Sequence, residues 1–114
     1  MSELLNRLSA YGVDIPSVLD RFVGDEELYD KCLFMFFEDK AFSELSAALN
    51  AKNYQLAFES AHTLKGVSAN LGLTPLYDAI CKVVEALRIG DNDKAQLESA
   101  GVRDEFERLK KIVS

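Results

Sequence analysis

The residues best suited to chemistry in this sequence lie close together at His62, Lys65 and Gly66. His62 is the only histidine of the chain, and a neutral imidazole nitrogen is a nucleophile that needs no prior deprotonation. Lys65 follows three residues later, one turn away on a helix, where its ammonium group can offset negative charge. Glycine inside a helix costs about 1 kcal/mol, so Gly66 indicates that something approaches this surface closely. The trio would suit transfer of a phosphoryl group to nitrogen.

The sequence contains no motif that is typical of other reaction types. A single histidine excludes a two-histidine zinc site, and the carboxylates show no metal-loop spacing. The sequence contains neither a phosphate-binding Gly-x-x-x-x-Gly-Lys-Ser/Thr loop nor a Gly-x-Ser-x-Gly nucleophile elbow. We therefore expect no metal and no cofactor on this chain.

The trio belongs to a segment with helical periodicity from about residue 53 to 71. Its apolar face centres on Ala61, and His62 lies about 100° away from that centre, at the border between core and solvent. The residues one or two turns from His62 share its side of the helix. They include Gln55, Phe58, Glu59 and Ala69.

The remaining elements are also predicted to be helical, because apolar residues recur with period 3.6 and never alternate strictly. Short helices are expected within residues 1–24. A longer helix is expected over about residues 25–40. A helical continuation is expected through residue 49, and the position of the break between the two is uncertain. Three further helices are expected over about residues 53–71, 74–90 and 93–113. The predicted fold class is all-α, an antiparallel four-helix bundle with short additional N-terminal helices. We expect one domain over residues 1–114, with residues 1–24 covering a bundle of about 25–113.

The sequence also predicts three local features. The third helix should face the core with Leu28, Cys32, Met35 and Phe36. Thr74 should cap the helix that begins at Pro75, and Gly72 is fully explained as the residue that ends the preceding helix.

Charge and composition restrict the partners. Nineteen acidic residues against thirteen basic ones give a net charge of −6 without a basic stripe, which argues against nucleic acid. The apolar run 32–37 is far shorter than the roughly 20 residues of a membrane span. The N-terminus lacks the basic start of a signal peptide. We expect a cytoplasmic monomer, with Cys32 and Cys81 as buried free thiols.

The segment Ala61-His62-Thr63-Leu64-Lys65-Gly66-Val67-Ser68-Ala69-Asn70-Leu71-Gly72 resembles the signature of histidine-containing phosphotransfer (HPt) domains. That signature is His-x-x-Lys-Gly, followed six residues later by glycine. The likeness extends from about Gly12 to Asp91, and the last helix matches only in length and pattern.

The resemblance implies a phosphorelay intermediate without kinase activity of its own. His62 would accept a phosphoryl group from an aspartyl phosphate of a response-regulator receiver domain, often within a hybrid sensor histidine kinase, and pass it to another receiver. The Mg²⁺ ion and the catalytic carboxylates would belong to the receiver. The expected docking surface surrounds His62 and adds two residues of the neighbouring helix. It comprises Gln55, Phe58, Glu59, Lys65, Gly66 and Ala69, extended by Glu85 and Arg88.

One position departs from the family pattern. Some members carry a glutamine on the facing helix that contacts the phosphoryl group, and the corresponding residue here is Val84. Lys65 is thus left as the main charged partner of the group. Two alternatives stay open: an interaction module that docks receivers or kinases without being phosphorylated, and a substrate domain from a chemotaxis-type kinase.

Overall fold

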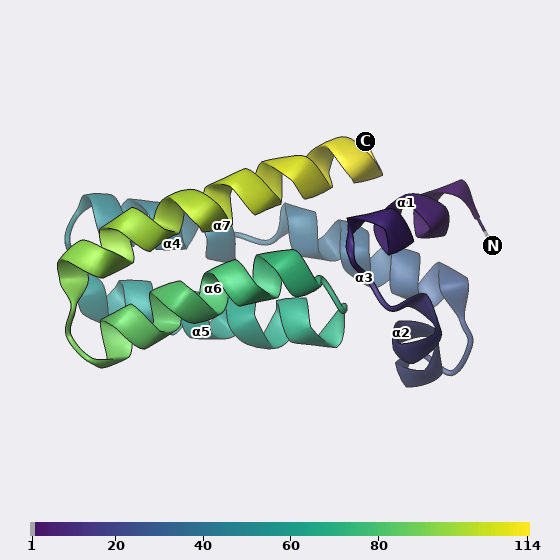
Figure 1. The fold of residues 1–114 in the computed structure, drawn as a ribbon, viewed down its shortest axis with the longest axis horizontal. Coiled ribbons are helices and arrows are strands. Elements are labelled where there is room, and N and C mark those ends of the chain that lie inside the picture. Colours follow the sequence, from purple (N-terminus) through teal and green to yellow (C-terminus); the bar gives the residue numbers. More distant parts are fainter. Residues whose placement is uncertain (1) are drawn as a thin grey trace.

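The computed structural model describes residues 2–114, which form seven α-helices joined by short turns (Figure 1). Met1, the first residue of the expected domain, lies outside the described part. No helix of residues 2–114 has the length and apolar character needed to span a membrane. The helices are α1 (Glu3–Tyr11), α2 (Ile15–Arg21), α3 (Glu26–Glu38), α4 (Ala41–Asn50), α5 (Tyr54–Asn70), α6 (Thr74–Arg88) and α7 (Asn92–Val113).

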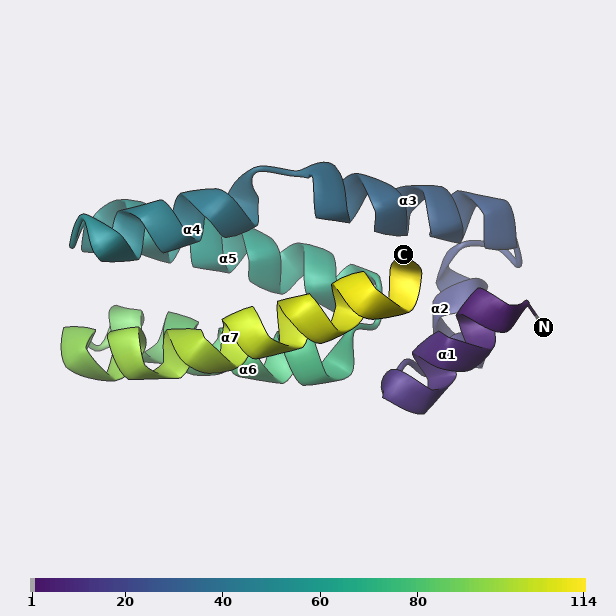
Figure 2. The ribbon, with the colours of Figure 1, turned by 90° about the horizontal axis from the view of Figure 1, so that it is seen from above.

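The last four helices form an antiparallel bundle, as predicted. In Figure 1, α4 and α7 make the upper layer, and α5 and α6 make the lower one. Viewed from above, α3 continues the line of α4 and extends beyond it toward α1 and α2 (Figure 2). The molecule is elongated, with extents of 42 × 23 × 21 Å. The expectation of an all-α bundle with short N-terminal helices is confirmed.

Polar side chains fix where most helices begin. Asn53 accepts a hydrogen bond from the Leu56 amide and thereby caps α5. The first helical residue of α6 differs from the prediction. Thr74 is itself helical, Leu73 occupies the cap position, and the Thr74 hydroxyl donates to the Gly72 carbonyl instead of capping the helix. The prediction of Thr74 as the cap was therefore wrong by one residue.

The expected inner face of α3 was wrong in part. Tyr29, Leu33 and Phe36 are buried, whereas Leu28 is 44% and Met35 is 61% exposed. Residues 32–37 are all apolar, so periodicity alone leaves two stripes to choose from. The stripe that includes Tyr29 faces the core. In this orientation the buried Tyr29 hydroxyl donates a hydrogen bond to the Leu71 carbonyl.

The two cysteines also differ from the expectation. Cys32 and Cys81 are free, as predicted, but each is half-buried rather than enclosed in the core. On α3, the helix turns its other stripe inward, which moves Cys32 to the edge of the core.

The C-terminal end of α5 is anchored by side chains from α2 and α3. The Tyr29 hydroxyl donates to the Leu71 carbonyl at 2.7 Å. One guanidinium nitrogen of Arg21 donates to the carbonyls of Ala69 and Asn70, at 2.7 and 2.8 Å. Helix ends leave such carbonyls without partners inside the helix, so these bonds tie the N-terminal helices to α5.

Gly72 does more than end α5. Its φ is +71°, a conformation that favours glycine, and a Cβ atom placed on it would lie 2.4 Å from Cγ1 of Val18. The absence of a side chain thus lets α2 approach the turn between α5 and α6. The interpretation of Gly72 as a helix terminus alone was incomplete.

Gly72→Ala should therefore destabilise the protein more than Gly90→Ala. Gly90 also has a positive φ, but a Cβ atom there meets nothing within 4 Å. We expect Gly90→Ala to lose about 1–2 kcal/mol from backbone strain, and Gly72→Ala to lose about 1–3 kcal/mol beyond that from overpacking. Urea unfolding measures both, and equal losses would show that the Val18 contact carries no cost.

Candidate functional site

Helix α5 runs between α4 and α6 and turns one face into the bundle. The buried residues share the predicted stripe: they are Ala57, Ser60, Ala61, Leu64 and Ser68. His62 lies outside this stripe and is exposed. The prediction of an accessible imidazole at the border of the buried face is consistent with this placement.

The His62 ring is oriented by an aromatic neighbour. The rings of Phe58 and His62 are nearly parallel, with an interplanar angle of 14° and centroids 6.0 Å apart. This geometry falls within the range of offset stacking. No side-chain hydrogen bond to His62 occurs within residues 2–114, so neither ring nitrogen is engaged by that part of the chain. Phe58 itself is half-buried and packs against the core, which gives the ring a firm support.

Gly66 leaves an open volume one turn beyond His62. A Cβ atom placed on Gly66 would meet nothing within 4 Å. The glycine is therefore not explained by packing against another helix, nor by an unusual backbone angle, since it continues α5. A bulky group can approach the helix surface beside the imidazole.

Lys65 supplies the positive charge predicted beside His62. It is half-buried, and within residues 2–114 no carboxylate lies within 4.0 Å of its ammonium group. Its charge contributes to the electrostatics of Glu85 on α6. The hydrogen bond from Arg88 holds the pKa of Glu85 below its ordinary value, and the charge of Lys65 acts in the same direction. The lysine thus lies at the border of α5 and α6 without a carboxylate bound to it.

The facing helix offers no neutral side-chain donor at the family position. Val84 is buried in the core and cannot reach a group on the His62 face. Glu85, the next residue, is exposed, and its carboxylate accepts a hydrogen bond from Arg88 Nε at 3.1 Å. The charged pair Glu85–Arg88 therefore borders the site where some family members place glutamine.

The other predicted docking residues share the exposed side of α5. Gln55, Glu59 and Ala69 are all exposed, and Gln55 donates a hydrogen bond to Glu59 at 3.2 Å. Phe58 is less accessible because it stacks on His62 and packs inward. We therefore assign Phe58 chiefly to orienting the imidazole. The docking role of these residues stays a prediction.

Sequence reasoning missed an apolar surface next to the site. A groove of about 230 Å³ separates α3 from α5, and Met35, Thr63 and Val67 are among the residues that line it. Outside the groove, α3 also exposes Leu28 and Phe34. The apolar run of residues 32–37 could have indicated this surface. Consecutive residues point to all sides of a helix, so a run of this length must expose some of its side chains to solvent.

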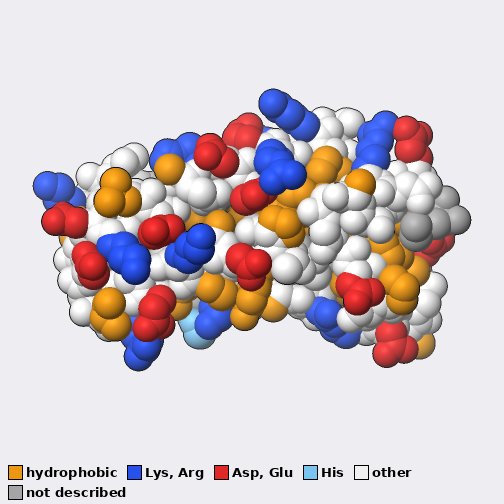
Figure 3. Space-filling view, viewed as in Figure 1, with side chains coloured by type: hydrophobic (Ala, Val, Ile, Leu, Met, Phe, Trp, Pro, Cys, Tyr) orange, Lys and Arg blue, Asp and Glu red, His pale blue; other side chains and the backbone are white. Residues whose placement is uncertain are grey.

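The charges on the visible face of α6 and α7 are mixed. Figure 3 shows acidic and basic side chains interspersed there, without a continuous basic stripe on that face. Within residues 2–114, no group of three or more His, Cys, Asp or Glu side chains is placed to hold a metal ion.

Comparison with known proteins identifies the family. The model of the Hpt domain family matches residues 33–112, from the middle of α3 almost to the end of α7. No curated protein and no solved structure matches the chain. Hpt domains in general are phosphohistidine carriers without kinase activity, and they interact with receiver domains and histidine kinases in two-component systems. Because the match covers well over half of its 114 residues, the chain belongs to the Hpt domain family.

Proposed function

We propose that this chain is a phosphorelay intermediate that carries the phosphoryl group on His62. It accepts the group from an aspartyl phosphate of a receiver domain and passes it to a second receiver. The observation that supports this most strongly is the His62 site itself: an exposed imidazole without an internal hydrogen bond, beside an unpaired Lys65 and the open space at Gly66.

The chemical step needs only what the two proteins bring together. An unprotonated ring nitrogen of His62 attacks phosphorus, and a nitrogen–phosphorus bond forms. The bond between phosphorus and the aspartate oxygen breaks, which returns the receiver's side chain to a carboxylate. Transfer to the second receiver runs through the same steps in reverse. The Mg²⁺ ion that assists on the receiver's side is expected to belong to the receiver.

Incubation with receiver domains charged by acetyl phosphate and Mg²⁺ should label the wild-type chain and leave His62→Gln unlabelled. The label should be lost in acid and kept in base, because it is a phosphoramidate. Circular dichroism of the variant should match the wild type, since His62 is exposed. Labelling that survives in His62→Gln would refute the assignment.

An alternative function is binding of receiver domains without phosphotransfer. An interaction module would bind receivers through the same surface without becoming phosphorylated. Binding of a charged receiver with no label on either the wild type or His62→Gln would favour this alternative. A substrate domain for a chemotaxis-type kinase would instead be labelled by the kinase and ATP.

Lys65 should affect the transfer rate more than stability. Its ammonium group, three residues from His62 on the same helix, would meet the phosphoryl oxygens, and a half-buried lysine can keep its charge in solvent while its stem lies along the bundle. We expect Lys65→Ala to slow transfer by a factor on the order of 10–1,000, with Lys65→Arg recovering part of the rate. Lys111→Ala, on the exposed end of α7, is the matched control. An unchanged rate in Lys65→Ala would mean that the partner supplies the charge.

The space at Gly66 should control access to the imidazole. Gly66→Ala should raise stability by up to about 1 kcal/mol, because its methyl group meets no neighbour. Gly66→Gln should fold but slow transfer by about 100-fold, as expected when the reacting groups cannot meet. Ala47→Gln, at an exposed position of α4, controls for the effect of adding a glutamine side chain to a helix surface. If Gly66→Gln both folds and transfers like the parent, steric access is not the role of the glycine.

We also propose that the receiver's docking surface reaches beyond α5 onto α3. The apolar groove lined by Met35 and Val67 is also lined by Thr63, the residue that follows His62 in the sequence. Apolar contacts at the centre of an interface favour binding, while rim charges such as Glu85 and Arg88 mainly set orientation and association rate. A relay partner must dissociate quickly, so we expect a small, transient interface.

Met35→Asp should weaken this docking without unfolding the chain, because Met35 is largely exposed. We expect the receiver concentration for half-maximal transfer to rise by about tenfold. Leu97→Asp removes a similarly exposed apolar side chain from α7 and should have no effect. Amide shifts on receiver binding should centre on α5 and α3. Shifts centred on α7 instead would place the partner elsewhere.

A further inference from the structure

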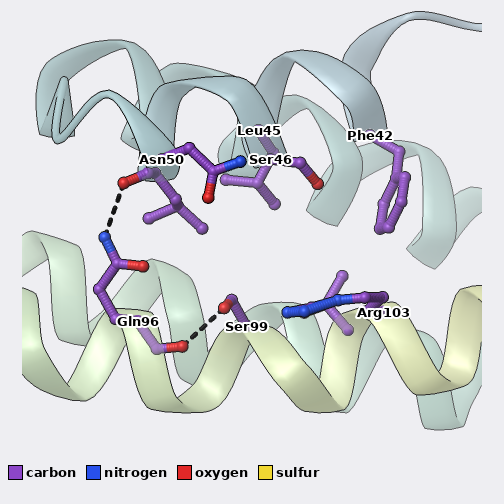
Figure 4. Close-up of a pocket in the computed structure, with 9 residues that line it drawn as sticks. Phe42, Leu45, Ser46, Asn50, Gln96, Ser99 and Arg103 are labelled. Atoms are coloured by element: carbon purple, nitrogen blue, oxygen red, sulfur yellow. Dashed lines mark hydrogen bonds between the residues drawn. The ribbon is translucent and has the colours of Figure 1, made fainter.

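Two hollowed surfaces of the structure lie outside the His62 site. The first is a cleft between α4 and α7, where the Gln96 amide donates to the Leu49 carbonyl and bridges the two helices (Figure 4). The apolar residues along this cleft, Leu45, Leu49 and Val102, are buried, so it offers a partner little apolar surface. The second is a shallow groove of about 420 Å³ on the outer face of α3.

The outer face of α3 is not covered by another helix. Viewed from above, α3 lies at the edge of the molecule, and this face points away from the other helices of residues 2–114 (Figure 2). All residues that line its groove belong to α3: they are Glu27, Asp30, Lys31, Phe34, Met35 and Glu38. Among them, only Met35 also lines the groove between α3 and α5. The outer face of α3 is therefore largely separate from the docking surface proposed for the receiver.

Exposed apolar side chains lie along this face. Phe34 is 45% exposed and Met35 is 61% exposed. Leu28, two turns before Met35 on the same side of the helix, is 44% exposed. Apolar residues scattered singly over a surface need no explanation, whereas neighbouring ones aligned along one helix indicate a surface that packs against a partner.

The same helix carries most of the net charge of the protein. Residues 25–39, which comprise α3 and its two capping residues, contain six acidic residues and one basic residue, a net charge of −5 out of −6 for the whole chain. Within residues 2–114, none of these carboxylates lies within 4.0 Å of a basic group. One oxygen of Asp30 is buried without a hydrogen-bond partner, and burial together with the charges of Glu26 and Glu27 raises the pKa of this carboxyl. The face thus combines apolar side chains with an excess of unpaired negative charge.

We propose that the outer face of α3 binds a basic amphipathic helix of a partner protein. Apolar side chains of that helix would pack on Leu28, Phe34 and Met35. Its lysine or arginine side chains would lie opposite the carboxylates of Glu27 and Glu38. The negative charge of α3 disfavours a nucleic acid, an anionic membrane and a second copy of this chain, because each would bring like charges together.

A synthetic peptide tests the proposal in an amide-shift titration of the full chain. The Leu–Lys peptide has the length of α3, with leucines along one side of a helix and lysines on the other sides. We expect saturable shifts centred on Phe34, with a Kd on the order of 10–100 µM at low salt that rises as salt is added. A peptide of the same composition without the apolar stripe should bind at least about tenfold more weakly. A peptide with glutamate in place of lysine should be weakened at least as much.

One pair of variants tests the apolar contact. Phe34→Ser should weaken binding of the Leu–Lys peptide by about tenfold. Leu97→Ser, which removes an exposed apolar side chain from α7, should leave binding unchanged. Unchanged amide shifts of α5 in Phe34→Ser would show that the bundle is intact.

A second pair of variants tests the charge. The double variant Glu27→Gln and Glu38→Gln should weaken binding of the Leu–Lys peptide by about tenfold. The double variant Asp104→Asn and Glu107→Gln makes the same change in net charge at exposed positions of α7, and it should weaken binding by less than about twofold.

The proposal is overturned by an absence of saturable shifts, by equal binding of either control peptide, or by losses that are equal in the α3 variants and their α7 controls. A dimer of the wild-type chain in sedimentation that is absent in Phe34→Ser would assign this face to a second copy instead. None of these readouts involves phosphotransfer, so they are independent of the proposed function.

Discussion

The structure depends on the anchoring of the C-terminal end of α5. Helix ends carry carbonyl groups that lack partners within the helix, and here Tyr29 and Arg21 supply donors to three of them. Because Gly72 has no side chain, Val18 of α2 can pack against the turn between α5 and α6. Through these contacts the N-terminal helices hold α5 in place while its opposite face stays in solvent. The exposed His62 imidazole thus lies on a helix that is packed against the bundle on its other face and anchored at its C-terminal end.

The bundle could be predicted because local signals agreed with tertiary packing. The 3.6-residue period of the apolar residues in α5 to α7 indicated the same helices that the structure shows. The third helix was harder, because residues 32–37 are all apolar and two stripes fit equally. The choice between them depends on the hydrogen bond from Tyr29 to Leu71, forty-two residues away. Periodicity carries no information about such a contact.

The residues at the centre of the candidate site could also be predicted from the sequence, whereas the apolar groove beside them could not. His62, Lys65 and Gly66 share one helix, so their spacing alone places them together. Glu85 and Arg88 were expected at the border on the neighbouring helix from the family resemblance, and the packing of α6 shows that Val84 is buried whereas Glu85 is exposed. The apolar groove between α3 and α5 and the cleft between α4 and α7 join residues from different helices. Such surfaces depend on how the helices pack against one another, and the periodicity of a single sequence does not predict that packing.

The most direct test of the central claim is an imidazole ¹H–¹⁵N correlation spectrum of the chain, recorded after exposure to a phosphorylated receiver domain. Because His62 is the only histidine, the spectrum contains one side chain, and its assignment is unambiguous. We expect one ring nitrogen to shift to a phosphoramidate position and to return when a second, unphosphorylated receiver is added. An unchanged imidazole spectrum while the chain carries phosphoryl label would contradict it.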